Sequence, residues 1–175
     1  MKKFSSFLIA LFLYLSSTVI NAEIIIDGKL DEAEWKEARQ ITSFYEVFPY
    51  TLNPVEDIRT VILIQESSEG IFLGFKNYQS NESMRSQSHQ RDNERSIADK
   101  NGVTIDFDAD KLSGYQFFVS SSGSIGDATY RNENERSYDW DADWLSAAST
   151  EDGVWYSEMF IPWTVAPMKA QSGEQ

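Results

Sequence analysis

The sequence predicts an all-β fold, an antiparallel β-sandwich of the immunoglobulin or jelly-roll type with one short helix near the N-terminus. Short apolar runs recur along the chain between turn signals rich in Asp, Gly, Ser and Asn, as in sandwich folds. Aromatic residues make up 14% of the chain, and aromatic side chains favour strands. Only one segment has convincing helix-start signals. We therefore expect two packed sheets and little helix.

Residues 1–22 have the pattern of a secretory signal peptide. Lys2 and Lys3 precede an apolar stretch from Phe7 to Leu15 that is short for a membrane span. Asn21-Ala22 places a small residue before a cut at Glu23. The alternative is an uncleaved membrane anchor. We expect secretion across an inner membrane to the periplasm, the outer membrane or the exterior, with residues 23–175 as one domain.

Composition narrows the classes of partner and chemistry. Without the leader, 13 basic residues stand against 28 acidic ones, a net charge of −15. This charge argues against binding to nucleic acid or anionic membranes, because phosphates would be repelled. Neutral ligands and divalent cations remain compatible with it. The chain has no cysteine, which excludes disulfides, thiol catalysis and zinc–thiolate sites.

The expected helix begins near residue 31. Asp31 is a good N-cap, and Glu34 stands three residues later, where it can reach back as in a capping box. Leu30 and Trp35 have the spacing of a hydrophobic staple. We expect a short amphipathic helix, with Trp35 as a buried residue, that folds back onto whatever Ile24 to Ile26 pair with.

Strand patterns follow along the rest of the chain. The cleanest is Val103 to Asp108, which alternates apolar and polar residues. Gln79 to Ala98 is polar and long enough for a functional surface loop. Lys169 to Gln175 is polar and adds no closing strand, so we expect a truncated chain with an unpaired sheet edge near its last strand. The predicted strands are 59–64, 71–76 (paired with 59–64 across the Glu66 to Gly70 turn), 103–108, 115–120 and 154–161.

Asp106, Asp108 and Asp110 are candidate calcium ligands. They alternate on and just past one strand, so their carboxylates can share a face. Ca²⁺ takes six to eight oxygen ligands in flexible geometry. The segment is not an EF-hand, because Lys111 occupies the position that needs glycine. The alternative is a solvated acidic strand edge that discourages edge pairing.

The segment Asp139-Trp140-Asp141-Ala142-Asp143-Trp144 is the candidate sugar-binding element. In an extended chain its aspartates face one way, while Trp140, Ala142 and Trp144 face the other. Aromatic faces stack on sugars, and carboxylates accept hydrogen bonds from sugar hydroxyls. The alternative is that both tryptophans belong to the core. No selective pair of acids indicates a glycosidase, and the single histidine, His89, lies in the polar loop without a serine motif.

Several segments together resemble family 9 carbohydrate-binding modules. The opening Ile26-Asp27-Gly28 through Glu34-Trp35 and the segment Glu158 to Pro162 are the most specific. Arg91-Asp92 resembles the arginine-aspartate segment of an exported bacterial subgroup, in which the module precedes an outer-membrane barrel-type region. The remaining matching segments are Phe44 to Pro49, 59–61, 71–74, 99–108, 115–117, 123–127 and 139–144.

The resemblance implies a β-sandwich that binds plant-type polysaccharides or oligosaccharides of the xylan and cellulose class, with calcium in some members and attachment to glycoside hydrolases. Founding members clamp the sugar between two tryptophans, but no aromatic residue stands near Ala98, where the first is expected. Candidate ligand residues are therefore Trp140, Trp144, Asp139, Asp141 and Arg91. The alternatives are a structural or interaction domain of an outer-membrane protein, which no longer binds sugar and instead binds an outer-membrane or envelope partner, and a glycoside hydrolase in its own right.

Overall fold

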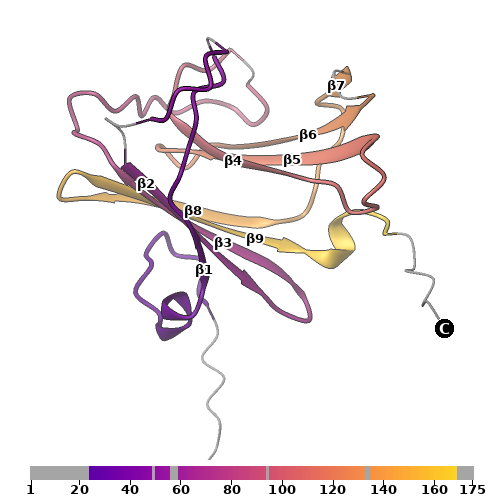
Figure 1. The fold of residues 1–175 in the computed structure, drawn as a ribbon, viewed down its shortest axis with the longest axis horizontal. Helices are drawn as coiled ribbons and strands as arrows, with labels where there is room; N and C mark the ends of the chain where they lie inside the picture. The colour runs from indigo at the N-terminus through magenta and orange to yellow at the C-terminus, as the bar shows by residue number, and fades with distance from the viewer. Residues whose placement is uncertain (1–23, 49, 56–58, 94, 133–134, 169–175) are drawn as a thin grey trace, which may run out of the picture.

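The computed structural model describes residues 24–48, 50–55, 59–93, 95–132 and 135–168, which fold as two stacked antiparallel sheets (Figure 1). The predicted all-β sandwich is confirmed. The expectations for residues 1–22 and 169–175 lie outside the described residues. The five-stranded sheet has the order β1 (Arg39–Ile41), β2 (Arg59–Glu66), β3 (Gly70–Tyr78), β9 (Val154–Pro162), β8 (Leu145–Glu151), and the four-stranded sheet has the order β4 (Lys100–Ile105), β5 (Ser113–Ser120), β6 (Ile125–Arg131), β7 (Glu135–Ser137).

The main core lies between the two sheets. Alternate residues of β3, β5 and β9 point inward, because successive side chains of a strand face opposite sides of its sheet. Val103, Ile105 and Phe107 pack against this core, as the alternation of their segment predicts. The buried members of the core cluster are Leu73, Phe75, Phe117, Val119, Trp144, Met159 and Ile161.

The expectation of an unpaired edge at Val154 to Ile161 is wrong. Strand β9 pairs with β3 on one side and with β8 on the other, so it lies inside the five-stranded sheet. Strand β8 was not predicted because Ser146 to Ser149 offers only small side chains. It turns into β9 at Asp152-Gly153, where both residues have positive φ values, 49° and 75°. An Asp-Gly pair suits such a two-residue hairpin turn.

The short N-terminal helix is confirmed, but its capping box is wrong. The helix is a single 3₁₀ turn, η1 (Ala33–Lys36), which begins after Glu32 and has no side-chain cap hydrogen bond. The Glu32 carboxylate instead accepts hydrogen bonds from the Ile25 N–H (3.0 Å) and from Trp35 Nε1 (3.1 Å). The Glu32 side chain therefore connects Ile25 to Trp35 through hydrogen bonds and does not cap the helix.

A second apolar cluster covers the outer side of the five-stranded sheet. Ile24, Trp35 and Ala38 are buried there, with Leu30 and Phe72 packed against them. The expected burial of Trp35 is thus confirmed, although Ile24 to Ile26 form no strand. No helix within the described ranges is long and apolar enough to cross a bilayer.

One fully buried acid holds the N-terminal segment onto this sheet. Glu158 of β9 accepts hydrogen bonds from the N–H groups of Asp27 (3.0 Å) and Gly28 (2.8 Å) through Oε2, and from Trp35 Nε1 (3.2 Å) through Oε1. Gly28 has φ +88°, and an added Cβ would lie 3.0 Å from the Ala148 carbonyl carbon. Glycine is needed here because both the positive φ and the close approach exclude a side chain.

Of two connections between strands, the structure agrees with the prediction for one and differs from it for the other. The segment from Gln79 to Ala98 has no strand among its described residues, as expected for a surface loop. Phe44 to Phe48, which resembles a strand of the family, forms none apart from an isolated bridge between Tyr45 and Pro54. Several side chains of this β1–β2 connection are instead exposed, with Phe48 at 94% and Tyr50 at 78%.

Candidate functional site

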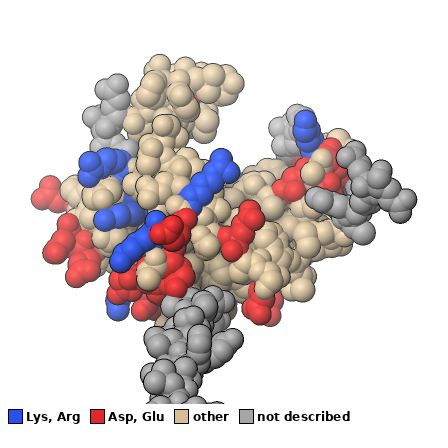
Figure 2. Space-filling view, turned by 60° about the horizontal axis from the view of Figure 1, so that its bottom comes forward, with Lys and Arg blue, Asp and Glu red and all other residues tan. Residues whose placement is uncertain are grey.

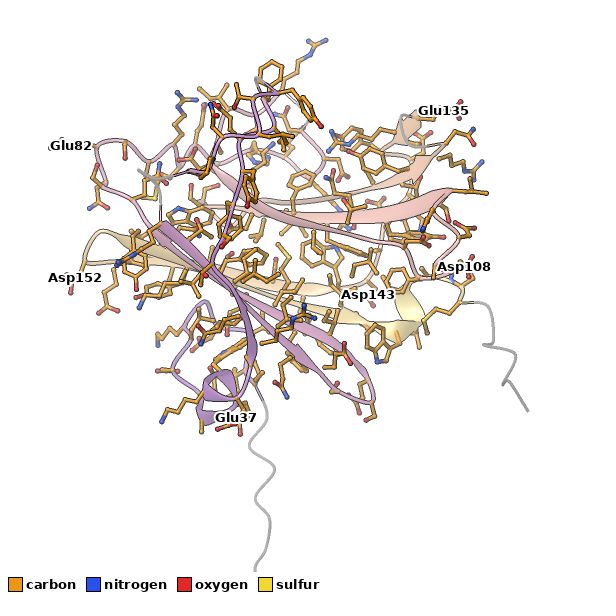
Figure 3. All side chains as sticks on the ribbon, viewed as in Figure 1. Glu37, Glu82, Asp108, Glu135, Asp143 and Asp152 are labelled. Atoms are coloured by element: carbon orange, nitrogen blue, oxygen red, sulfur yellow. The ribbon has the colours of Figure 1, made fainter. Side chains whose placement is uncertain are left out.

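The segment from Asp139 to Trp144 connects β7 of one sheet to β8 of the other. Trp140, Ala142 and Trp144 pack against the main core, whereas the three aspartates of the segment are exposed. The predicted alternation is confirmed, although the segment is extended chain outside the sheets. Figure 3 labels Asp143 in this segment and Glu135 on β7 at the upper right.

The two tryptophans of the segment have different environments. Trp144 is only 6% exposed, lies 5.5 Å from the Phe117 ring centroid, and donates from Nε1 to Asp127 Oδ2 at 2.8 Å. Its ring is part of the core, which was the alternative interpretation. Trp140 is half-buried, with ring centroids 4.9 Å from Tyr115 and 5.8 Å from Phe117 in edge-on geometry.

Trp140 borders a hollow of about 580 Å³, which we call the Trp140 groove. Its volume lies in the range of about 300–1,000 Å³ that is usual for ligand pockets. Asp139 is at the rim, and its Oδ2 accepts a hydrogen bond from Ser137 Oγ at 3.2 Å. The groove combines aromatic faces with charged groups of both signs. Its lining residues are Tyr115, Thr129, Arg131, Glu135, Arg136, Ser137, Asp139 and Trp140.

Arg91 does not line this groove. It joins the polar loop of residues 79–98 to the segment from Asp139 to Trp144. Its Nη2 lies 2.5 Å from Asp127 Oδ2 and 2.9 Å from the Ala142 carbonyl oxygen. Its Nε lies 3.1 Å from Asp141 Oδ1 and 3.7 Å from Asp92 Oδ2. Arg91 and Asp141 are therefore paired with each other, and the prediction that they bind a ligand stays a prediction.

Asp127 of β6 is fully buried, and the sequence did not indicate its role. Its Oδ2 accepts from Arg91, from the Ala142 N–H (3.1 Å) and from Trp144 Nε1. The Asp127 N–H in turn donates to Asp92 Oδ1 at 2.8 Å. Burial raises the pKa of Asp92, and the negative charge of Asp127 adds to this effect. Asp127 thus sets the position of the segment that carries both tryptophans.

The predicted calcium residues lie in the turn between β4 and β5. Asp106 accepts hydrogen bonds from the N–H groups of Asp108 (3.2 Å) and Lys111 (2.7 Å). Asp110 Oδ1 accepts from the Leu112 N–H at 2.8 Å. Asp108, labelled in Figure 3, lies in the same turn. The Asp106 and Asp110 carboxylates cap turns, and the three acids do not form a group with metal-site spacing in the described part of the chain.

A different group of acids has that spacing. Within the described residues, one oxygen each of Asp92, Asp127 and Asp141 lie within 4.8 Å of one another. Oδ1 of Asp127 is buried and has no hydrogen-bond partner there. Three carboxylates share the single positive charge of Arg91, which leaves an excess of negative charge. Oxygen ligands and uncompensated charge of this kind fit Ca²⁺.

A further hollow of about 490 Å³ lies on the outer side of the five-stranded sheet. Figure 2 shows acidic and basic side chains next to one another in the view turned toward this side. Lys76 lies over the rings of Tyr78 (5.0 Å) and Tyr156 (5.7 Å), and its hydrogen bond with Tyr78 raises the pKa of Lys76. With Lys29, Asp31, Glu32 and Glu151 also in the lining, this hollow favours no single class of ligand.

Neither a protein family nor a curated protein matches the sequence. Among solved structures, the chain is similar to a carbohydrate-binding module of family 9 from Caldicellulosiruptor kristjanssonii in complex with cellotriose. The identity is 10% and the TM-score 0.52, and the alignment covers 81% of this chain and 64% of that chain. This chain therefore spans less than two thirds of that protein's length. The likeness shows a common β-sandwich fold.

Proposed function

We propose that this protein is a non-catalytic carbohydrate-binding domain that takes an oligosaccharide in the Trp140 groove. The observation that carries the proposal is a half-buried indole beside a hollow with charged groups at its rim. Aromatic rings bind the apolar face of a sugar, and polar groups around them select its hydroxyls. The module of similar fold from C. kristjanssonii was solved with cellotriose, which supports a neutral glucan or xylan ligand.

Intrinsic fluorescence tests this proposal, because Trp140 is half-buried while Trp35, Trp144 and Trp155 are buried. Addition of cellotriose or xylotriose is expected to shift the emission, and Trp140→Ala is expected to remove both the shift and the binding. Trp163→Ala is the matched control, since Trp163 is also half-buried but lies on the separate 3₁₀ turn η2 (Trp163–Val165). An absence of any shift at millimolar sugar refutes the proposal.

Calcium is a second part of the proposal. The acids that fit it are Asp92, Asp127 and Asp141. Bound Ca²⁺ would neutralise the negative charge of these three carboxylates that the single positive charge of Arg91 does not balance. Thermal unfolding in CaCl₂ and in EDTA tests this. A higher midpoint in calcium that is lost in Asp141→Asn is expected. If Asp106→Asn removes the effect of calcium instead, the calcium site is the one predicted from the sequence, with Asp106, Asp108 and Asp110 as ligands.

The wider role that we propose is secretion and participation in polysaccharide catabolism beside a glycoside hydrolase. The leader-like residues 1–22 and the resemblance of the Ile26-to-Trp35 and Glu158-to-Pro162 segments support it. Detection of the mature chain beginning at Glu23 in a periplasmic or extracellular fraction tests the secretion step. A chain that keeps its first residues in the cytoplasm contradicts it.

A specific observation favours an interaction domain as the alternative. The β1–β2 connection exposes Tyr45, Val47, Phe48, Tyr50 and Leu52 together, in a chain of high negative charge. Exposed apolar groups of this kind mark partner surfaces. If this is the main function, Phe48→Ser and Tyr50→Ser abolish association with an outer-membrane or envelope fraction, while sugar has no effect on it.

A further inference from the structure

The outer face of the four-stranded sheet has a hollow of about 260 Å³. Unlike the Trp140 groove, it is lined by basic but not by acidic side chains. We call it the cationic pocket. Its floor is formed by outward-facing residues of neighbouring strands: Gly102 of β4 pairs with Phe118 of β5. The lining residues are Lys100, Gly102, Gln116, Phe118, Arg136 and Tyr138.

Two cations face this pocket over aromatic rings. Lys100 Nζ lies 4.9 Å from the Phe118 ring centroid, and the Arg136 guanidinium carbon lies 4.6 Å from the Tyr138 ring centroid. Arg136 also donates to Gln116 Oε1. Burial lowers the pKa of Lys100, and the positive charge of Arg136 lowers it further. The two side chains are therefore close enough to repel each other.

No carboxylate among the described residues compensates for this repulsion. None of the lining residues is acidic, and the Lys100 ammonium donates to the Asn93 carbonyl oxygen (3.5 Å) rather than to a carboxylate of the described residues. The whole chain carries 28 acidic residues and a net charge of −13. In such a chain, two neighbouring cations over an aromatic floor point to an anionic ligand.

We propose that the cationic pocket binds a uronic acid residue of an acidic polysaccharide. This inference rests on the proposed glycan-binding function and extends it to a second, charged subsite. The sugar carboxylate can accept hydrogen bonds from Lys100 and Arg136, while the pyranose ring lies beside the half-buried Tyr138 ring that lines the same pocket. The Gln116 amide is placed to bind a hydroxyl group of the same ring.

The size of the pocket favours a sugar over an acidic peptide. Its volume is below the range of about 300–1,000 Å³ for larger ligands, so it suits one ring and its carboxylate. Gly102 adds no side chain to the floor, where an added Cβ would lie 3.3 Å from Phe117 O and 3.4 Å from Phe118 Cβ. Arg136 lines both this pocket and the Trp140 groove, on the two sides of β7. One oligosaccharide that crosses this edge can therefore contact both sites.

Calorimetric titration of the purified protein with trigalacturonate tests the proposal. EDTA is included so that calcium cannot bridge the uronate to the acidic protein surface. Arg136→Gln and Lys100→Gln are each expected to weaken binding about tenfold or more, as for loss of a charge-assisted hydrogen bond. Arg59→Gln is the matched control, because Arg59 also lies over a tyrosine ring, 4.2 Å from the Tyr78 centroid, but on the other sheet.

The outcomes separate this inference from the proposed function. Failure of trigalacturonate to bind, or equal binding by the wild type and both variants, overturns the uronate site. Binding of polyglutamate as tightly as trigalacturonate also overturns it, since the ligand would then be an acidic peptide. A parallel titration with cellotriose reports on the Trp140 groove alone. Its failure, with Arg136-dependent trigalacturonate binding intact, refutes the neutral-glycan proposal and leaves the cationic pocket supported.

Discussion

The ionisation of Glu158 makes the stability of the protein depend on pH. This carboxyl is fully buried, and burial is the largest of several effects that together raise its pKa from 4.5 to about 7. The charge of Glu32 raises the pKa further, whereas the hydrogen bonds from the Gly28 and Asp27 N–H groups lower it. Between pH 4.5 and 7 the folded protein therefore keeps a proton that the unfolded chain has released.

The sign of the effect follows from this difference in bound protons. Stability falls as the pH rises wherever the folded state binds more protons than the unfolded state. For Glu158 the loss begins near pH 4.5 and is complete above pH 7. The interval between the two pKa values corresponds to about 3 kcal/mol of free energy of unfolding.

Guanidinium unfolding followed by tryptophan fluorescence at pH 5 and pH 8 measures this effect. Wild-type protein is expected to lose about 2–3 kcal/mol more between these pH values than Glu158→Gln, which cannot ionise, because part of the loss has already occurred at pH 5. Glu69→Gln, a change at an exposed glutamate, is expected to keep the wild-type pH dependence. Equal losses in wild type and Glu158→Gln would show that the buried carboxyl does not ionise over this range, and would refute the reasoning.

Three further substitutions probe buried polar contacts and packing by chemical denaturation. Glu158→Leu leaves the Asp27 and Gly28 N–H groups and Trp35 Nε1 without their acceptor, so a loss of about 3 kcal/mol or more is expected. Asp127→Ala removes the acceptor of Arg91 and Trp144 and is expected to cost about 3–5 kcal/mol. Gly126→Ala places a Cβ 2.1 Å from Phe118 Cζ, with an expected cost of about 1–3 kcal/mol. A midpoint unchanged from wild type in any of them contradicts the corresponding contact.

The strands that sequence predicts best are those with one face in the core. Val103, Ile105 and Phe107 alternate with polar residues because only one side of β4 packs against the other sheet. Strand β8 has no such signal, because Ser146 to Ser149 presents small side chains on both faces. Its place is decided by pairing with β9 rather than by its own pattern.

In the candidate site, too, the local sequence predicts which way side chains point, whereas contacts with distant residues decide how buried they are. The alternation of residues 139–144 was predictable, but the accessibility of each tryptophan was not. Trp144 is buried because Asp127 of β6 binds its Nε1, and Trp140 is held against Tyr115 of β5. Buried acids such as Asp127 leave no local pattern, since their partners come from remote parts of the chain.

The position of β9 has a consequence for the kinetics of folding. It is the last strand of the described chain, yet it lies between β3 and β8 and binds Asp27 across 131 positions of sequence. Contacts between residues far apart in sequence slow folding, because the chain loses the entropy of loop closure before these contacts stabilise it. The hairpin of β2 and β3 keeps one edge of β3 unpaired until residues 154–162 pair with it. Closure of the five-stranded sheet is thus a late step of folding.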